Sequence, residues 1–198
     1  NEFDKNIWET YKLNHPQTHL IEGDIRQITK KDMEPFIEDE VDGIIGGPPC
    51  QAYSTIGRVI NFKKKETDER IYLYKFYIKF LRKYSPDFFI FENVKGLLSF
   101  KDTNNKLLLP QIKKDFEKAG YAIQYEVINT KFFDVAQSRE RIIIFGAKKE
   151  FKCFPTHFFD HLNNKKSLIP PTVHEVFCGL PFLKSGKTNN CYTSEKNR

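Results

Sequence analysis

Apolar residues recur along this chain at two spacings, and their order predicts strands alternating with helices. Short apolar runs predict strands over residues 18–22, 41–45, 88–91, 121–130 and 140–147. Apolar residues three and four apart predict helices over residues 1–14, 29–40, 71–84, 109–119 and 172–183. This alternation predicts an α/β protein whose sheet is mostly parallel and flanked by helices.

The stretch GGPPCQAYS, residues 46–54, ends the strand predicted over residues 41–45. Gly46 and Gly47 let a backbone or a ligand approach closely, and the two prolines that follow make the turn stiff. The turn therefore displays Cys50 at the carboxyl edge of the sheet, where open α/β folds bind their ligands. An inert, buried cysteine is the alternative interpretation of such a residue.

Polar side chains that suit chemistry follow two other strands. Glu92 and Asn93 come directly after the apolar run 88–91, so we expect Glu92 to be desolvated, which favours its protonated, hydrogen-bond-donating form. A helix cap or a structural ion pair would also explain this acid. Gln137, Arg139 and Arg141 alternate at spacing two, so an extended segment would project them from one face toward an anion or a base edge. An exposed edge strand gives the same pattern.

Composition narrows the class of protein. The 198 residues suffice for one domain, and 32 basic against 26 acidic residues give a net charge of +6, which suits a polyanion such as nucleic acid. The four cysteines are widely spaced, which predicts a reducing, intracellular setting without disulfides. No apolar run is long enough to span a membrane. Cys153, His157 and His161 are four residues apart but lack a fourth ligand, so we expect no metal.

Three motifs in the same order, GGPPCQAYS, FENVKGLL and QSRERIIIFG, closely resemble those of the DNA (cytosine-5)-methyltransferases. The segments NEFDKNIWETYKLNH and EGDIRQI are similar to that family's cofactor-binding segments, and PPTVHEVFCGLPFLKSG is similar to the segment after its catalytic core. The resemblance covers residues 1–183. It implies a Rossmann-like fold that binds S-adenosylmethionine.

The resemblance also implies that this fold is incomplete here. The family's first glycine-rich motif, its target-recognition domain and its last motifs have no counterpart in the sequence, so we expect part of a longer protein. Residues 1–150 would be the partial catalytic core, and residues 151–198 the connection toward the target-recognition domain.

The resemblance assigns roles by position. Cys50 would attack carbon 6 of a cytosine flipped out of duplex DNA, Glu92 would bind its ring, and Arg139 and Arg141 would hold its carbonyl oxygen and a nearby phosphate. The polar segment 55–70 corresponds to the loop that closes over the flipped base. The further substrate-binding residues that the resemblance implies are Gln51, Ser54, Asn93 and Gln137. The cofactor-binding residues that it implies are Glu2 for the ribose hydroxyls, Phe3 for adenine, Asp24 for its amine, Ile25 beside it, and Pro49 at the methionine end.

The biological setting follows from the same resemblance. It implies a restriction-modification methylase of prokaryotic type in the cytoplasm, acting on nucleoid DNA, with S-adenosylhomocysteine as product and a cognate endonuclease as partner. A split enzyme would also need a complementary subunit. An RNA-directed relative is the main alternative, but Ser54 and the pattern from Gln137 to Arg141 favour DNA. A non-catalytic relative is disfavoured because Cys50, Glu92 and both arginines are retained.

Overall fold

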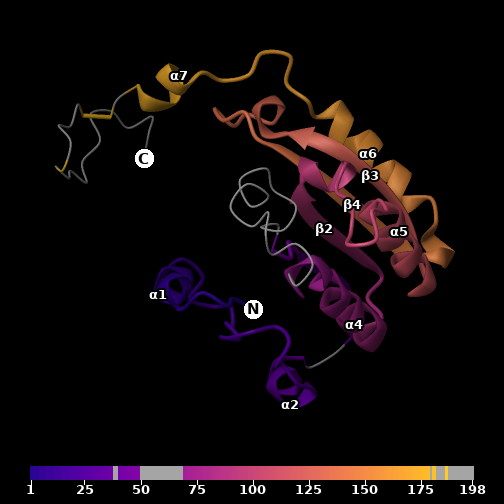
Figure 1. Ribbon diagram of the computed structural model, residues 1–198. Helices are drawn as coiled ribbons and strands as arrows, with labels where there is room; N and C mark the ends of the chain where they lie inside the picture. Colours follow the sequence, from indigo (N-terminus) through magenta and orange to yellow (C-terminus); the bar gives the residue numbers. More distant parts are fainter. Residues whose placement is uncertain (38–39, 50–68, 179, 182–185, 187–198) are drawn as a thin grey trace.

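A four-stranded sheet in the order β1-β2-β4-β3 forms the centre of the fold (Figure 1). The structure, a computed structural model, describes residues 1–37, 40–49, 69–178, 180–181 and 186. The strands are β1 (Gly43–Gly46), β2 (Phe88–Val94), β3 (Tyr121–Asn129) and β4 (Glu140–Lys148). Helices lie on both faces of this sheet, so the predicted α/β class is confirmed.

The described part of the sheet is mixed. β1 runs parallel to β2, whereas β4 is antiparallel to both of its neighbours, β2 and β3. The sequence predicted a mostly parallel sheet, and the short segment 130–139 explains the difference. A parallel pair needs a crossover of about a dozen residues or more, usually a helix, so β3 and β4 pair antiparallel instead.

Helices α4 (Tyr74–Tyr84) and α5 (Leu108–Lys118) cover one face of the sheet, close to their predicted positions. Their apolar sides meet rings from β2. The ring of Tyr77 lies edge-on to Phe91, with 5.5 Å between centroids, and the Phe116 ring lies 4.4 Å from that of Phe89. Gly120, at φ +102°, ends α5 in the left-handed region that glycine tolerates best. This aromatic layer is the main core.

Helix α6 (Phe154–Asn164) covers the opposite face over β3 and β4, and the sequence did not predict it. Its Phe158 stacks on Phe145 of β4, with 4.3 Å between centroids, and Phe159 is buried. The boundary predicted at residue 150 stays a prediction, although α6, which follows it, packs on the sheet. On this face Ile45 of β1 is 73% exposed, so the prediction of a buried strand over residues 41–45 is wrong for Ile45.

The N-terminal segment, with α1 and α2, lies apart from the sheet and the helices that cover it (Figure 1). Helix α1 (Lys5–Asn14) begins four residues later than the helix predicted over residues 1–14, because Asp4 caps it and its carboxylate accepts the N–H of Asn6 at 2.9 Å. Helix α2 (Lys30–Met33) continues into a 3₁₀ turn, so it is shorter than the helix predicted over residues 29–40. The strand predicted over residues 18–22 is reduced to one parallel bridge between Glu2 and Glu22.

Short helical segments complete the described chain. Helix α7 (Val173–Phe177) begins at a capping box formed by Thr172 and Glu175. The 3₁₀ turns are η1 (Glu34–Phe36), η3 (Glu69–Tyr72), η4 (Lys95–Leu98), η5 (Thr130–Phe132) and η6 (Lys149–Phe151). Within the described ranges, no helix has the length and apolar character needed to cross a membrane.

The hydroxyl of Tyr77 ties β1 to β2 inside the core. It lies 2.8 Å from the carbonyl oxygen of Ile44 and 3.0 Å from that of Ile90, and it can donate its hydrogen to either. Burial raises the pKa of Tyr77 well above its ordinary value, so the hydroxyl stays a neutral donor. One side chain of α4 thus connects the two parallel strands below the edge where β1 ends.

We expect Tyr77→Phe to lower the free energy of unfolding by about 1 kcal/mol, because the aromatic packing remains while the buried hydroxyl contacts are lost. Urea denaturation measures this as a lower midpoint with an unchanged slope. Tyr125→Phe is the matched control, since no hydrogen bond from its hydroxyl to a described residue is found. Equal stability of the two variants would contradict the bridging role of Tyr77.

Candidate active site

The candidate site lies at the edge where the parallel strands β1 and β2 both end. Gly46 closes β1, and Gly47, Pro48 and Pro49 lead away from it toward Cys50. Cys50, Gln51, Ser54 and the predicted closing loop over residues 55–70 fall wholly or mostly outside the described residues. The structure therefore describes residues 46–49, which lead to the cysteine, and the side chains around these residues.

Asn93 of β2 holds the backbone of the turn over residues 47–49 in place. Its side chain is only 1% exposed, and its Nδ2 donates to the carbonyl oxygen of Pro48 at 3.2 Å. Its Oδ1 accepts the N–H of Val94 at 2.9 Å. A buried amide with its donor and acceptor both in use restrains the backbone strongly, because breaking either bond would leave a buried polar group unsatisfied. Asn93 thus holds the turn two residues before Cys50 against β2.

The two glycines of the turn are in contact with different groups. A Cβ added at Gly46 would lie 2.7 Å from a ring carbon of Tyr77, and one added at Gly47 would lie 2.8 Å from Oε2 of Glu92. Both distances are too short for a real side chain. The glycines therefore allow the turn to lie directly on the core at Gly46 and directly beside the Glu92 carboxylate at Gly47.

Glu92 forms an ion pair with Arg141 across β2 and β4. Arg141 Nε lies 2.7 Å from Glu92 Oε1, and the register explains the contact because Val94, two residues after Glu92, is the partner of Arg141. Diagonal neighbours on one face of an antiparallel pair are within reach of long side chains. A second pair, Lys95 with Glu140 at 2.9 Å, joins the same ends of the two strands. The sequence did not identify that second pair.

The expected desolvation of Glu92 is wrong for this structure. The side chain is 40% exposed, because β2 continues to Val94 and strand alternation turns Glu92 away from the face that α4 and α5 cover. The carboxylate faces Arg141 and the Gly47 turn instead. An ion pair was one of the alternatives that the sequence left open, and it is the arrangement found here.

Gln137 and Arg139 lie in the connection before β4 rather than in the strand. Thr130 secures this connection: its hydroxyl donates to the carbonyl oxygen of Gln137 at 2.6 Å, and its N–H donates to that of Arg139 at 3.1 Å. Both side chains are exposed. Of the three polar residues at spacing two, only Arg141 is in contact with Glu92.

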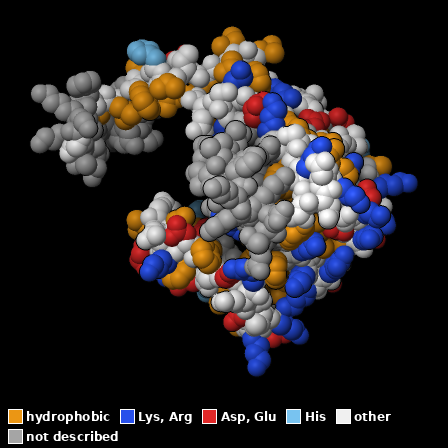
Figure 2. All heavy atoms as spheres, in the orientation of Figure 1, with side chains coloured by type: hydrophobic (Ala, Val, Ile, Leu, Met, Phe, Trp, Pro, Cys, Tyr) orange, Lys and Arg blue, Asp and Glu red, His pale blue; other side chains and the backbone are white. Residues whose placement is uncertain are grey.

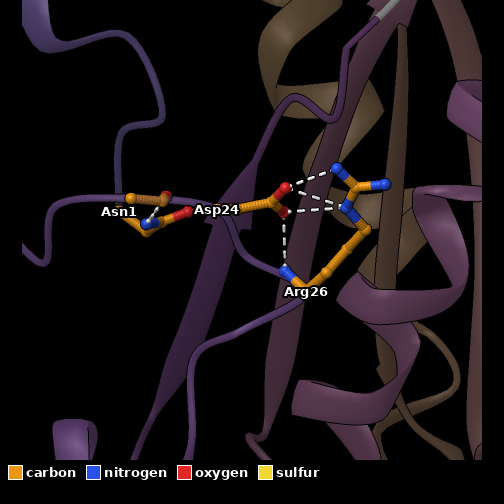
Figure 3. A network of polar contacts seen from close by, with 4 residues as sticks. Asn1, Asp24 and Arg26 are labelled. Carbon is orange, nitrogen blue, oxygen red and sulfur yellow. Dashed lines mark hydrogen bonds and ion pairs between the residues drawn. The ribbon is translucent and has the colours of Figure 1, made fainter.

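Backbone contacts bring the segments that hold Glu2 and Asp24, two of the predicted cofactor residues, side by side near the start of the chain. The N–H of Glu2 donates to Ile21 at 3.2 Å, and the carbonyl oxygen of Glu2 accepts the N–H of Gly23 at 2.9 Å. The side chain of Asn1 donates to the carbonyl oxygens of the same two residues, at 2.9 and 2.8 Å. The segment before Asp24 is thereby aligned with the chain start (Figure 3).

The carboxylate of Asp24 forms an ion pair with Arg26. Figure 3 shows the guanidinium facing the carboxylate, with Arg26 Nη2 at 2.5 Å from Asp24 Oδ2. The backbone N–H of Arg26 also donates to Asp24 Oδ1 at 2.9 Å. These bonds hold the pKa of Asp24 below its usual value, the side-chain bond from Arg26 being the largest cause. The sequence did not identify Arg26 or Asn1 as partners in this cluster.

These residues are chemically suited to an adenosine group. Glu2 and Asp24 supply carboxylates that accept from hydroxyl and amine donors, and the ring of Phe3, 70% exposed, offers a face for stacking. Glu2 Oε1 already accepts the N–H of Asp4 at 2.8 Å, which orients the carboxylate and leaves its other oxygen for a ligand. Ile25 and Pro49 are also among the described residues, but no hydrogen bond or ion pair links either side chain to Glu2, Phe3 or Asp24.

Comparison with known proteins identifies the family of this chain. The family model for the C-5 cytosine-specific DNA methylase matches residues 1–197. The Type II methyltransferase M.NgoPII of Neisseria gonorrhoeae is 41% identical over 152 residues, which are 77% of this chain and 41% of that protein. The Type II methyltransferase M.DdeI of Desulfomicrobium norvegicum is 31% identical over 195 residues, 93% of this chain and 43% of that protein. The chain thus spans about two fifths of the length of these relatives.

Solved structures share the fold. A protein described as a DNA modification methyltransferase encoded within an E. coli prophage matches with a TM-score of 0.68 and 23% identity, over 92% of this chain and 48% of that one. Spodoptera frugiperda DNMT2 matches with a TM-score of 0.54 and 21% identity, over 76% of this chain and 42% of that one. The Rossmann-like methyltransferase class is confirmed, and the chain belongs to the C-5 cytosine-specific DNA methylase family.

Proposed function

We propose that the protein transfers a methyl group from S-adenosylmethionine to carbon 5 of cytosine in duplex DNA. The observation that carries this proposal is the position of the Glu92–Arg141 pair. It lies against Gly47, in the turn that Asn93 fixes just before Cys50. A carboxyl group, a guanidinium and the approach to a thiol thus meet at one strand edge. These groups match the nitrogen, the carbonyl oxygen and the electrophilic carbon of a cytosine ring.

Cys50 acts as the nucleophile in this proposal. Its thiolate adds to carbon 6 of cytosine, the new S–C bond uses the thiolate electron pair, and the ring electrons move to make carbon 5 nucleophilic. S-adenosylmethionine supplies the electrophilic methyl group and leaves as S-adenosylhomocysteine. A base then removes the proton from carbon 5, and the electrons of that C–H bond expel the cysteine thiolate. The reaction needs no metal.

Glu92 and Arg141 bind the ring together. To donate to ring nitrogen 3, Glu92 must take up a proton and release Arg141, which then turns toward the carbonyl oxygen of the base. Their pairing without substrate keeps both groups at the site, so both side chains are at hand when the cytosine enters. Arg139 and Gln137, in the connection that Thr130 secures, would contact the same base or the adjacent phosphate.

Asn93 positions the turn that leads to Cys50 and has an indirect role in substrate binding, because its side-chain nitrogen and oxygen both bond backbone groups. Gln51 and Ser54, which flank the nucleophile, remain proposed substrate contacts. For the cofactor we propose Glu2 at the ribose hydroxyls, Phe3 at the adenine ring and Asp24 at its amine. Ile25 lies next to Asp24 in the sequence, and Pro49 would contact the methionine end of the cofactor. At least one bond between the Arg26 guanidinium and the Asp24 carboxylate must then break when adenosine binds, so that a carboxylate oxygen can accept from the adenine amine.

The cytosine must leave the duplex before a thiol can approach its ring from above, which costs about a few kcal/mol. The similarity to Type II methyltransferases supports a role in restriction-modification, with a cognate endonuclease as partner in a bacterial cytoplasm. Where the remaining family segments lie on another chain, that subunit would be a second partner.

We expect the full-length protein to transfer tritium from labelled S-adenosylmethionine to duplex DNA and not to tRNA. Cys50→Ser should abolish transfer, and Glu92→Gln should lower kcat by about two to four orders of magnitude, because proton donation is lost while shape is kept. Cys153→Ser is the matched control, since Cys153 is an exposed free thiol far along the chain, and it should retain full activity. Label in tRNA alone, or transfer by Cys50→Ser, would contradict the proposal.

The two glycines of the turn allow a paired test. Gly47→Ala should lower kcat about tenfold or more with little loss of stability, because the new methyl group displaces the flexible Glu92 carboxylate. Gly46→Ala should instead lower the free energy of unfolding by about 1–3 kcal/mol, because it collides with the buried Tyr77 ring. Urea denaturation and initial methylation rates, measured on both variants, check this. The same balance of effects in both variants would refute the assignment of Gly47 to the site.

A further inference from the structure

Helix α4 presents a face that carries only positive charge. Lys75, Lys79, Arg82 and Lys83 are all exposed, and no acidic residue occurs between Tyr74 and Tyr84. Figure 2 shows lysine and arginine side chains gathered over the position that α4 has in Figure 1. We call these four residues the basic face of α4. The proposed reaction uses none of them.

Aromatic rings support the lysines of this face. Phe76, Phe80 and Tyr84 of α4 recur every fourth residue and are half-buried, and Tyr72, at the end of η3, precedes them at the same spacing. The ammonium of Lys75 lies 4.6 Å from the Tyr72 ring centre, that of Lys79 lies 4.4 Å from Phe76, and that of Lys83 lies 4.7 Å from Tyr84. Cation–π contacts of this kind orient an ammonium group without neutralising its charge.

Several basic residues elsewhere in the fold have acidic residues beside them, unlike those of α4. Helix α5 carries three lysines but also Asp115 and Glu117, and Lys95 and Lys148 form ion pairs with Glu140 and Asp87. No ion pair to a described residue is found for the four cations of α4. The basic face therefore gathers four exposed cations on one helix without an acidic residue among them. Its complement is a partner with regularly spaced negative charges.

The basic face starts beside the candidate active site. Tyr77, in the first turn of α4, contacts Gly46 at the end of β1, and the helix runs from there away from the edge. From Lys75 to Arg82 the helix rises about 10 Å, at about 1.5 Å per residue. That length matches about three phosphates along one strand of B-DNA, which are about 3.4 Å apart along the axis.

We propose that the basic face of α4 binds the phosphate backbone of duplex DNA beside the base pair that enters the active site. This inference rests on the proposed function only in taking duplex DNA as the polyanion. Phosphate contacts carry no sequence information, so this face contributes affinity and orientation for any duplex. The choice of recognition site is left to other parts of the protein.

Substitution of the basic face tests the proposal in the full-length protein. We expect the triple variant Lys75→Gln, Lys79→Gln, Arg82→Gln to bind a fluorescent duplex of about 30 base pairs at least about tenfold more weakly near 50 mM salt. Each phosphate contact contributes about 0.9 to the slope of log K against log salt, so the slope should become less negative by about 2.7. The loss should be equal for duplexes with and without a methylation site.

Two controls separate charge from folding and from position. The charge-conserving variant Lys75→Arg, Lys79→Arg should bind as the unsubstituted protein does. Lys152→Gln, Lys165→Gln, Lys166→Gln removes the same charge from the ends of α6, on the other side of the sheet, and should leave the slope unchanged. An unchanged slope in the α4 variant, or equal losses in the α4 and α6 variants, would overturn the proposal.

Methylation measured in parallel distinguishes this proposal from the proposed function. If the unsubstituted protein methylates DNA while the α4 variant binds it with an unchanged slope, the basic face fails and the function stands. If the unsubstituted protein methylates no DNA but the α4 variant loses the salt-dependent binding, the function fails and the basic face stands.

Discussion

The parallel pairing of β1 with β2 is the constraint on which the candidate site depends. It brings the turn after Gly46 to the same edge as Glu92 and Asn93, although more than 40 residues separate them in the sequence. Tyr77 bonds carbonyl groups of both strands from the core side, and Asn93 bonds the turn itself. A shift of one residue in this register would turn Glu92 toward the core and Asn93 away from Pro48.

A charged pair placed at an exposed strand edge contributes little to stability but much to orientation. The Glu92 and Arg141 side chains are partly exposed, so their mutual attraction is screened by solvent and its contribution to folding is small. Held 2.7 Å apart on diagonal positions of a packed sheet, they present an acceptor and a donor side by side. The antiparallel contact between β2 and β4 thus matters as much for the site as the parallel contact between β1 and β2.

Periodicity predicted most elements correctly, because the rule that it uses is local. Helices α1, α4 and α5 and strands β2, β3 and β4 lie close to their predicted positions, since their apolar faces are complete within each segment. The exposure of Ile45 and the absence of a strand over residues 18–22 could not be predicted from local sequence, because each depends on which other segments of the chain pack beside that segment. Helix α6 was missed because its aromatic residues occur among histidines and asparagines and follow Lys152 and Cys153 without a capping signal.

The sequence motifs predicted which residues belong to the candidate site, but not how those residues contact one another. Spacing and resemblance identified Glu92 and Arg141, but their contact follows from the register of two antiparallel strands. The buried role of Asn93 and the two different contacts of Gly46 and Gly47 likewise depend on packing across the edge. The pair of Asp24 and Arg26 could not be predicted either. It forms because the chain turns after Asp24, which brings the guanidinium of Arg26 back to the carboxylate.

Covalent attack by Cys50 is the central claim, and 5-fluorocytosine tests it most directly. A duplex with this base at the target position should form an adduct with the full-length protein in the presence of S-adenosylmethionine. Fluorine cannot leave as a proton does, so the S–C bond formed at carbon 6 would persist. Protease digestion and mass spectrometry should then find the modified nucleotide on the peptide that contains Cys50. A stable adduct on any other residue, or methyl transfer to normal DNA without an adduct on the fluorinated duplex, would contradict the account.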